Sequence, residues 1–237
     1  MKPLLLLALI PALTTSAFAI DLGKLIFQDD FNRTESQANV EDIGNGWSTN
    51  SKARAKGDKQ VALKDGAMHI SISPRADHAV TVTHAAEFTD GTVTLRFMLE
   101  DEKDSLGLDF ADPQCKEVHA GHLCAAKVTT KQVELIDHKT GGMRLDIHDA
   151  KTDKKPLTDE QKQALVGKTK GVPHATELGK WHELQVTIQG DEISVSIDGQ
   201  AIGSLHSPGV AHPTKRQLRL SVPHNAVVDD VKIYSKS

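Results

Sequence analysis

Aromatic residues are scarce in this chain, which holds two tryptophans, one tyrosine and six phenylalanines among 237 residues. So few large rings exclude a broad aromatic platform of the kind that stacks against polysaccharide chains. They leave Trp47 and Trp181 as the two indole rings. Charge of one sign is scarce as well, because the net charge is −4 and acidic and basic residues are interspersed without a basic stripe. Nucleic acid is therefore not expected as a partner.

Long hydrophobic runs are absent beyond the first residues. One apolar run, Leu4 to Leu13, is followed by Ala17-Phe-Ala19, a small-residue cleavage signature. This pattern predicts a signal peptide over residues 1–19, a mature chain that starts at Ile20, and a secreted or periplasmic protein. The run is too short to span a bilayer, so no integral membrane segment is expected after cleavage; a retained anchor is the alternative.

Cysteine is limited to Cys115 and Cys124. An exported protein meets oxidising conditions, so the pair predicts a disulfide that closes a small loop. The alternative is a zinc site that both cysteines form with His119 and His122, since all four side chains are of zinc-ligand type. Their spacing matches no standard zinc pattern, which favours the disulfide.

Alternation of apolar and polar residues with period two runs through most of the chain and indicates β-strands. It is clearest near the C-terminus, where Leu184, Val186 and Ile188 face one way and Gly190 marks a reversal. Gly141-Gly142 indicates a further hairpin turn. Earlier strands are expected over 25–31 and near 59–64, 67–73, 78–84, 91–99, 104–110, 122–129, 131–138 and 143–148. This many strands with few helices predict one all-β domain over residues 20–237, a sandwich of two antiparallel sheets.

One segment departs from this alternation. Residues 157–167 begin with Thr158 and Gln161 at capping-box spacing and end at Gly167, which predicts one short helix. The helix lies in an insertion of about residues 149–174. That insertion is either a surface excursion that packs one apolar stripe on a sheet or a lid beside a binding face. Trp181, which opens the next strand, is expected in the core.

Several motifs resemble a known superfamily. The run Asp29-Asp-Phe-Asn32, a later Gly44-Asn-Gly-Trp47, the strands from Trp181 to Leu205 and the closing Asp229 to Tyr234 are similar to the concanavalin A-like lectins and glucanases. Within that superfamily the chain most resembles the secreted 3-keto-disaccharide hydrolase domains, which have a laminin-G-like jelly roll. Val133–Asp137 is loosely similar to an acidic strand of that family. The resemblance implies a concanavalin-like jelly-roll sandwich, a carbohydrate or glycoside partner, and a concave sheet that carries the binding residues.

The resemblance also implies a chemistry different from that of a retaining glucanase. No Glu-x-Asp-x-x-Glu strand is present, and Glu134 and Asp137 point to opposite faces of a flat strand. In a 3-keto-disaccharide the ketone acidifies the neighbouring C–H bond, so a base and an acid can cleave the glycoside by proton abstraction and elimination. The family's usual opening is replaced by Ile26–Phe31. A non-catalytic carbohydrate-binding module and an envelope structural module are therefore the alternatives to a hydrolase or lyase.

Polar residues that alternate with core positions are the candidates for such a site, although the outer face of any sandwich is polar. A histidine or a partly buried glutamate can act as the base, and an arginine can hold the charge of the enolate. Catalytic roles are expected for Glu134, His138, His148 and Arg96, and substrate-binding roles for His69, Arg144 and Trp47.

Two pairs of carboxylates predict a structural ion. Asp29 or Asp30 on the first strand and Asp229 or Asp230 on the last can meet, because the terminal strands of jelly rolls are neighbours. Hard oxygen ligands suit calcium, although such pairs also occur in ordinary surface turns. The elimination chemistry needs only an acid and a base, so no cofactor is required beyond this possible calcium ion.

Overall fold

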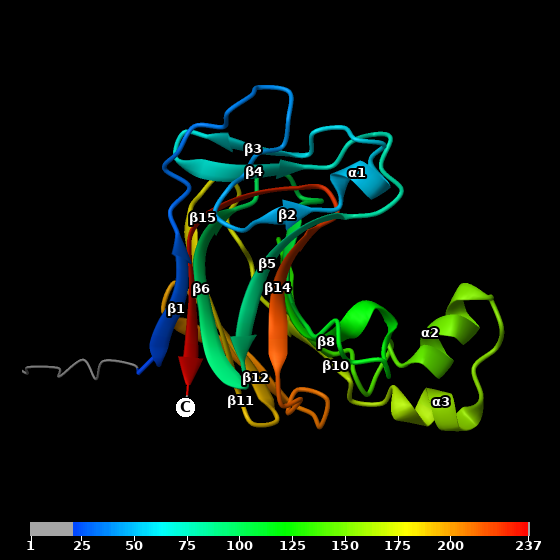
Figure 1. The fold of residues 1–237 in the computed structure, drawn as a ribbon. Coiled ribbons are helices and arrows are strands. Elements are labelled where there is room, and N and C mark those ends of the chain that lie inside the picture. Colours follow the sequence, from blue (N-terminus) through cyan, green and yellow to red (C-terminus); the bar gives the residue numbers. More distant parts are fainter. Residues whose placement is uncertain (1–20, 237) are drawn as a thin grey trace, which may run out of the picture.

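Two antiparallel sheets stack face to face in the computed structural model, which describes residues 21–236. Sheet A has the strand order β13 (Gln200–His206), β12 (Glu192–Ile197), β11 (His182–Gln189), β6 (Asp90–Met98), β15 (Asn225–Lys236), β4 (Ala67–Ser71) and β3 (Val61–Lys64), and β1 (Lys24–Asp29) also pairs with β15. Sheet B has the order β10 (Thr169–Pro173), β9 (Gln132–Asp137), β8 (His122–Thr129), β7 (Ser105–Ala111), β14 (Lys215–Val222), β5 (Val80–Phe88) and β2 (Ser48–Thr49). The predicted all-β sandwich is confirmed (Figure 1).

The core lies between the two sheets and follows from the period-two pattern. Leu184, Val186 and Ile188 of β11 are buried, and so are Leu218 and Leu220 of β14. The buried apolar side chains of both sheets form one contiguous cluster. Alternate residues therefore face outward on each sheet, where they are free to form sites.

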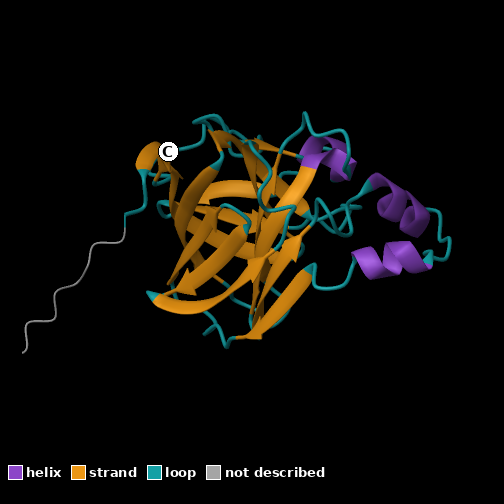
Figure 2. Cartoon of the chain, turned by 90° about the horizontal axis from the view of Figure 1, so that it is seen from below, coloured by secondary structure: helices purple, strands orange, loops and turns teal. Residues whose placement is uncertain are grey.

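The insertion contains a helix that the sequence did not predict. The strand expected over 143–148 is wrong, because α2 spans Leu145–Thr152 and buries Ile147 alone. The hairpin predicted at Gly141-Gly142 is also wrong, because that turn leads into α2 rather than into a strand. The one helix that the sequence predicts is α3 (Asp159–Ala164), and its capping box of Thr158 and Gln161 is present. None of the residues of α3 is buried, so the expected apolar stripe does not pack on a sheet. Figure 2 shows both helices outside the sandwich.

Trp181 lies outside the core, contrary to expectation. Its exposed fraction is 37%, and the guanidinium carbon of Arg96 lies 4.6 Å from its ring centroid. Even-numbered residues of β11 face inward, so the residue before His182 falls on the outer face. No bulge shifts this register between β11 and β6.

The predicted disulfide between Cys115 and Cys124 is not formed, and both thiols are free and buried. Cys124 faces the core between the sheets, where burial raises the pKa of its thiol. Cys115 packs instead with Leu123, the neighbour of Cys124 on β8, in a separate small cluster. Because adjacent strand residues point to opposite faces, the two thiols lie on opposite sides of sheet B. This arrangement also rules out the zinc site that would have used both cysteines.

The predicted signal peptide over residues 1–19 lies outside the described residues. Within residues 21–236, no helix is long and apolar enough to cross a membrane.

Candidate active site on the outer face of sheet B

A charged pair crosses the middle of sheet B on its outer face. Leu108 and Phe110 face the core from β7, so Asp109 between them faces outward. Arg219 lies in the same way between Leu218 and Leu220 of β14, and the register places it directly opposite Asp109. The guanidinium Nη1 lies 3.8 Å from Asp109 Oδ2, and both side chains are largely buried.

A tight turn before β8 brings two imidazoles to this pair. The turn spans His119–Gly121, and Ala120 adopts a φ of 50°, a left-handed conformation unusual for alanine. Gly121 is required next to it, since a Cβ there would lie 2.3 Å from the backbone oxygen of Asp112. Arg219 Nη2 donates a hydrogen bond to the carbonyl of Ala120 at 3.0 Å, which ties the turn to the sheet.

His122 makes the closest contact of the group. Its Nδ1 lies 2.5 Å from Asp109 Oδ2, so the two form an ion pair whenever the imidazole is protonated. The contact lacks the alignment of a hydrogen bond, and both His122 Nδ1 and Asp109 Oδ1 are buried without a hydrogen-bonding partner. Buried polar atoms without partners are rare in folded proteins, and a catalytic role is one of the explanations for them.

Two further imidazoles come from other segments. His138, which follows β9, has its ring centroid 5.7 Å from that of His122. His148 on α2 stacks on His119, with ring centroids 3.7 Å apart and ring planes 10° apart. Four imidazoles, one carboxylate and one guanidinium therefore gather on one face, which α1 (Ser51–Arg54) and the α2–α3 insertion frame in Figure 1.

The surroundings favour the neutral form of His119 and His138. Burial lowers the pKa of His138, and the nearby His122 lowers it further, while Asp109 opposes the shift. Burial also lowers the pKa of His119, and His148, His122 and Arg54 of α1 add to the effect. A neutral imidazole can accept a proton at neutral pH. The face thus combines proton acceptors with a positive charge on Arg219 that can hold a developing anion.

The structure divides the predicted site residues between the two sheets. Glu134 and His138 share the outer face of sheet B as predicted, and His148 lies on that side through α2. Glu134 accepts a hydrogen bond from Gln132 at 2.7 Å and lies 3.9 Å from Lys127 Nζ.

The remaining predicted residues lie elsewhere. Arg96 and His69 are on sheet A, on the opposite side of the sandwich, so the prediction that Arg96 shares a face with Glu134 is wrong. Arg144 caps the start of α2 and pairs with Asp146. Trp47 is 8% exposed and donates from Nε1 to Asp29 at 2.9 Å, so its ring is mainly structural.

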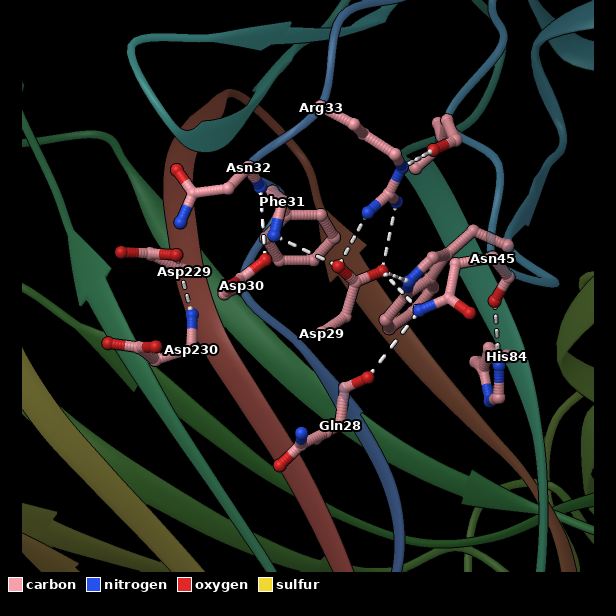
Figure 3. A network of polar contacts seen from close by, with 12 residues as sticks. Gln28, Asp29, Asp30, Phe31, Asn32, Arg33, Asn45, His84, Asp229 and Asp230 are labelled. Atoms are coloured by element: carbon pink, nitrogen blue, oxygen red, sulfur yellow. Dashed lines mark hydrogen bonds and ion pairs between the residues drawn. The ribbon is translucent and has the colours of Figure 1, made fainter.

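The four carboxylates expected to hold calcium lie near one another, because β1 pairs with β15 (Figure 3). The oxygens of Asp29 already accept hydrogen bonds from Arg33, Trp47, Asn45 and the Phe31 amide. Arg96 lies within 3.2 Å of Asp229 and 3.6 Å of Asp230. Among residues 21–236, no group of three or more His, Cys, Asp or Glu side chains is arranged to hold a metal ion. The arrangement gives calcium no support, and its binding stays a prediction.

Sequence reasoning missed Asp109, Arg219 and His122 as a group. Asp109 and Arg219 are charged residues between two large apolar ones, which is a signal that a strand carries a buried charge on its outer face. His119 and His122 were considered only as ligands of zinc. Their link to Arg219 comes from strand pairing between distant segments, which no local pattern shows.

Comparisons with known proteins agree with this fold. The family described as the 3-keto-alpha-glucoside-1,2-lyase-like domain matches residues 34–231. Among solved structures, the endo-β-1,3(4)-glucanase SCLam of family GH16 is similar at a TM-score of 0.59 and 14% identity, over 90% of this chain and 91% of that one. A laminarinase from a Flavobacterium species is similar at a TM-score of 0.56 and 12% identity, over 90% and 100% of the chains.

A carbohydrate-binding module from Bacillus subtilis is also similar, at a TM-score of 0.51 and 14% identity, over 80% of this chain and 96% of that one. At these identities the likeness shows the fold alone, a concanavalin-like jelly roll. A search of curated proteins found no match.

Proposed function

This chain belongs to the 3-keto-alpha-glucoside-1,2-lyase-like family, and we propose that it cleaves 3-keto-glycosides by elimination on the outer face of sheet B. One observation carries the assignment. Asp109, His122 and Arg219 come from three adjacent strands and meet beside His119 and His138.

The elimination needs a base, an acid and a site for negative charge. A ketone at C3 acidifies the C–H bond at C2, so a base can remove that proton and leave an enolate. The enolate then expels the glycosidic oxygen from C1, and a C1–C2 double bond forms as the C1–O bond breaks. The leaving oxygen takes up a proton, so one proton leaves carbon and one reaches oxygen.

His122 is the base in this scheme. Asp109 faces its Nδ1, which favours the tautomer that carries the proton there and leaves Nε2 free to accept a proton from C2. Arg219 holds the enolate oxygen, and its orientation is fixed by hydrogen bonds to Gln217 and to the Ala120 carbonyl.

A second group donates a proton to the leaving oxygen. His119, with its ring centroid 6.4 Å from that of His122, is the donor in this scheme when its imidazole is protonated, and His148 holds its ring by stacking. Glu134 and His138 lie on the same face and contact the sugar.

Export belongs to the same proposal. Cleavage after Ala19 would release a protein that begins at Ile20 and meets its substrate in the periplasm or the medium. The prediction that the reaction requires no cofactor stays a prediction.

The test is turnover of a 3-keto-α-glucoside and of its unoxidised parent, followed by product detection. We expect the wild type to cleave the keto form alone, and His122→Ala to lose this turnover while keeping its melting temperature. If the wild type never cleaves the keto sugar yet binds an oligosaccharide, the protein is a binding module instead. The pair of substrates separates the two results, because an ordinary glycosidase would cleave the parent as well.

A further inference from the structure

Sheet A carries a groove on its outer face, on the far side of the sandwich from the imidazoles. Its volume is about 340 Å³, and its walls include Arg96, Glu183, Lys232, Tyr234 and Leu22. Apart from Leu22 and Gly199, its lining residues come from β12, β11, β6 and β15, four adjacent strands of sheet A.

The floor of this groove is one straight row of uncharged polar side chains. Ser196 pairs with Gln185, and Gln185 pairs with Thr94, on neighbouring strands. Charged side chains of Arg96, Glu183 and Lys232 stand around this row. At the usual strand spacing, the row from Ser196 to Thr94 is about 10 Å long, enough for two sugar rings.

The charges around the groove compensate one another. Arg96 lies 3.2 Å from Asp229 and 3.6 Å from Asp230. Glu183 and Lys232, of opposite sign, also line the groove. An anion or a cation would therefore find little net attraction, whereas hydroxyl and amide groups on the floor can donate and accept hydrogen bonds.

Apolar surface stands beside these polar groups. Tyr234, the one tyrosine of the chain, lines the groove, and Trp181 lies next to it under the Arg96 guanidinium with 37% of its surface exposed. Aromatic rings of this kind pack against the C–H faces of sugars. A concave site with neutral polar groups and a ring at its side suits a neutral ligand that is polar at its edges and apolar on its faces.

We propose that this groove binds a neutral oligosaccharide without cleaving it, as a second carbohydrate site opposite the imidazole face. The two sites would let one molecule hold a glycan on sheet A while a small glycoside reacts on sheet B. The groove needs no catalytic group, and its function is independent of the elimination proposed above.

The test is calorimetric titration of the protein with maltohexaose, cellohexaose and laminarihexaose. We expect at least one of these glucans to bind. Ser196→Arg, which fills the groove, and Gln185→Ala, which removes the central amide, should each weaken that binding at least about tenfold. Gln189→Ala is the matched control, because Gln189 is an exposed glutamine of the same strand outside the groove.

Two further variants separate this site from the imidazole face. His122→Ala should bind the glucan as tightly as the wild type, and Gln185→Ala should cleave a 3-keto-glucoside at the wild-type rate. Failure of all three glucans to bind would overturn the proposal. So would binding that Ser196→Arg and Gln185→Ala leave unchanged, or binding that His122→Ala removes.

Discussion

Replacing Asp109 with asparagine should damage stability and activity together. The change keeps the shape of the side chain and removes the charge that faces His122 and Arg219. At an effective dielectric constant near 20, unit charges at the 3.8 Å separation of Asp109 and Arg219 attract by about 4 kcal/mol. Hydrogen bonds from Arg219 to Gln217 and Ala120 remain, so we expect the free energy of unfolding to fall by about 2–4 kcal/mol.

The matched control is Asp112→Asn. Asp112 is a similarly buried carboxylate whose side chain accepts hydrogen bonds from His212 at 3.1 Å and from Arg216 at 2.6 Å rather than facing His122, although its backbone borders the same turn. Both variants should melt roughly 5–15 °C below the wild type. Only Asp109→Asn should lose activity, by about a hundredfold or more in kcat/KM. Only this change removes the carboxylate that holds His122, the base, in the tautomer needed to accept a proton.

The assay is steady-state cleavage of a 3-keto-α-glucoside at a temperature well below both melting points. Wild-type kcat/KM in Asp109→Asn would refute the assignment of His122 and its carboxylate. An equal loss in Asp112→Asn would show that the activity follows stability rather than the charge at this site.

Three further predictions concern pH and the two indole rings. Burial opposes ionisation of Asp137, but hydrogen bonds from Ser207, Thr140 and Gly209 hold its pKa below the ordinary value. Its contribution to stability is therefore complete above the unfolded-state pKa of about 4 and is lost as the pH falls through the lower folded value, which urea unfolding from pH 7 to pH 2 will detect. Burial lowers the pKa of His119, the proton donor of the scheme, so its protonated form becomes more abundant as the pH falls; kcat/KM should therefore rise from about pH 8 to about pH 6.5, and a rate that falls with acid over this range would contradict the assignment. Trp47→Ala should cost about 3–5 kcal/mol and Trp181→Ala about 1 kcal/mol or less by urea unfolding, and the reverse order would contradict their placement.

Local patterns predicted most of the strands and the faces of most of their side chains, but they missed β10 and β14. Val133 and Leu135 face inward, so the outward position of Glu134 followed from alternation alone. The same rule could not say which sheet a strand joins, because both sheets have an inner and an outer face. Arg96 was correctly placed facing away from the core, and it was wrongly grouped with Glu134 because β6 belongs to the other sheet.

The candidate site was beyond the reach of local patterns for a related reason. Asp109 and Arg219 are 110 positions apart in the numbering, and only strand pairing between β7 and β14 brings them together. α2 was mistaken for a strand because Met143 to His148 alternate over too few residues to distinguish the two periods. His148 therefore reached the site by a route that differs from the predicted one, from a helix rather than from the sheet.

The fate of the hydrogen at C2 is the most direct test of the central claim. That claim is that the outer face of sheet B removes a proton from C2 of a 3-keto sugar. A 3-keto-α-glucoside labelled with deuterium at C2 is incubated with the wild type in ordinary water, and the products are analysed by mass spectrometry and NMR. Substrate incubated with His122→Ala controls for exchange without catalysis and should keep its label and remain uncleaved. The account predicts that the product formed from the 3-keto ring has lost the C2 deuterium. A product of that ring that retains the deuterium would show direct cleavage of the C1–O bond and would contradict the account.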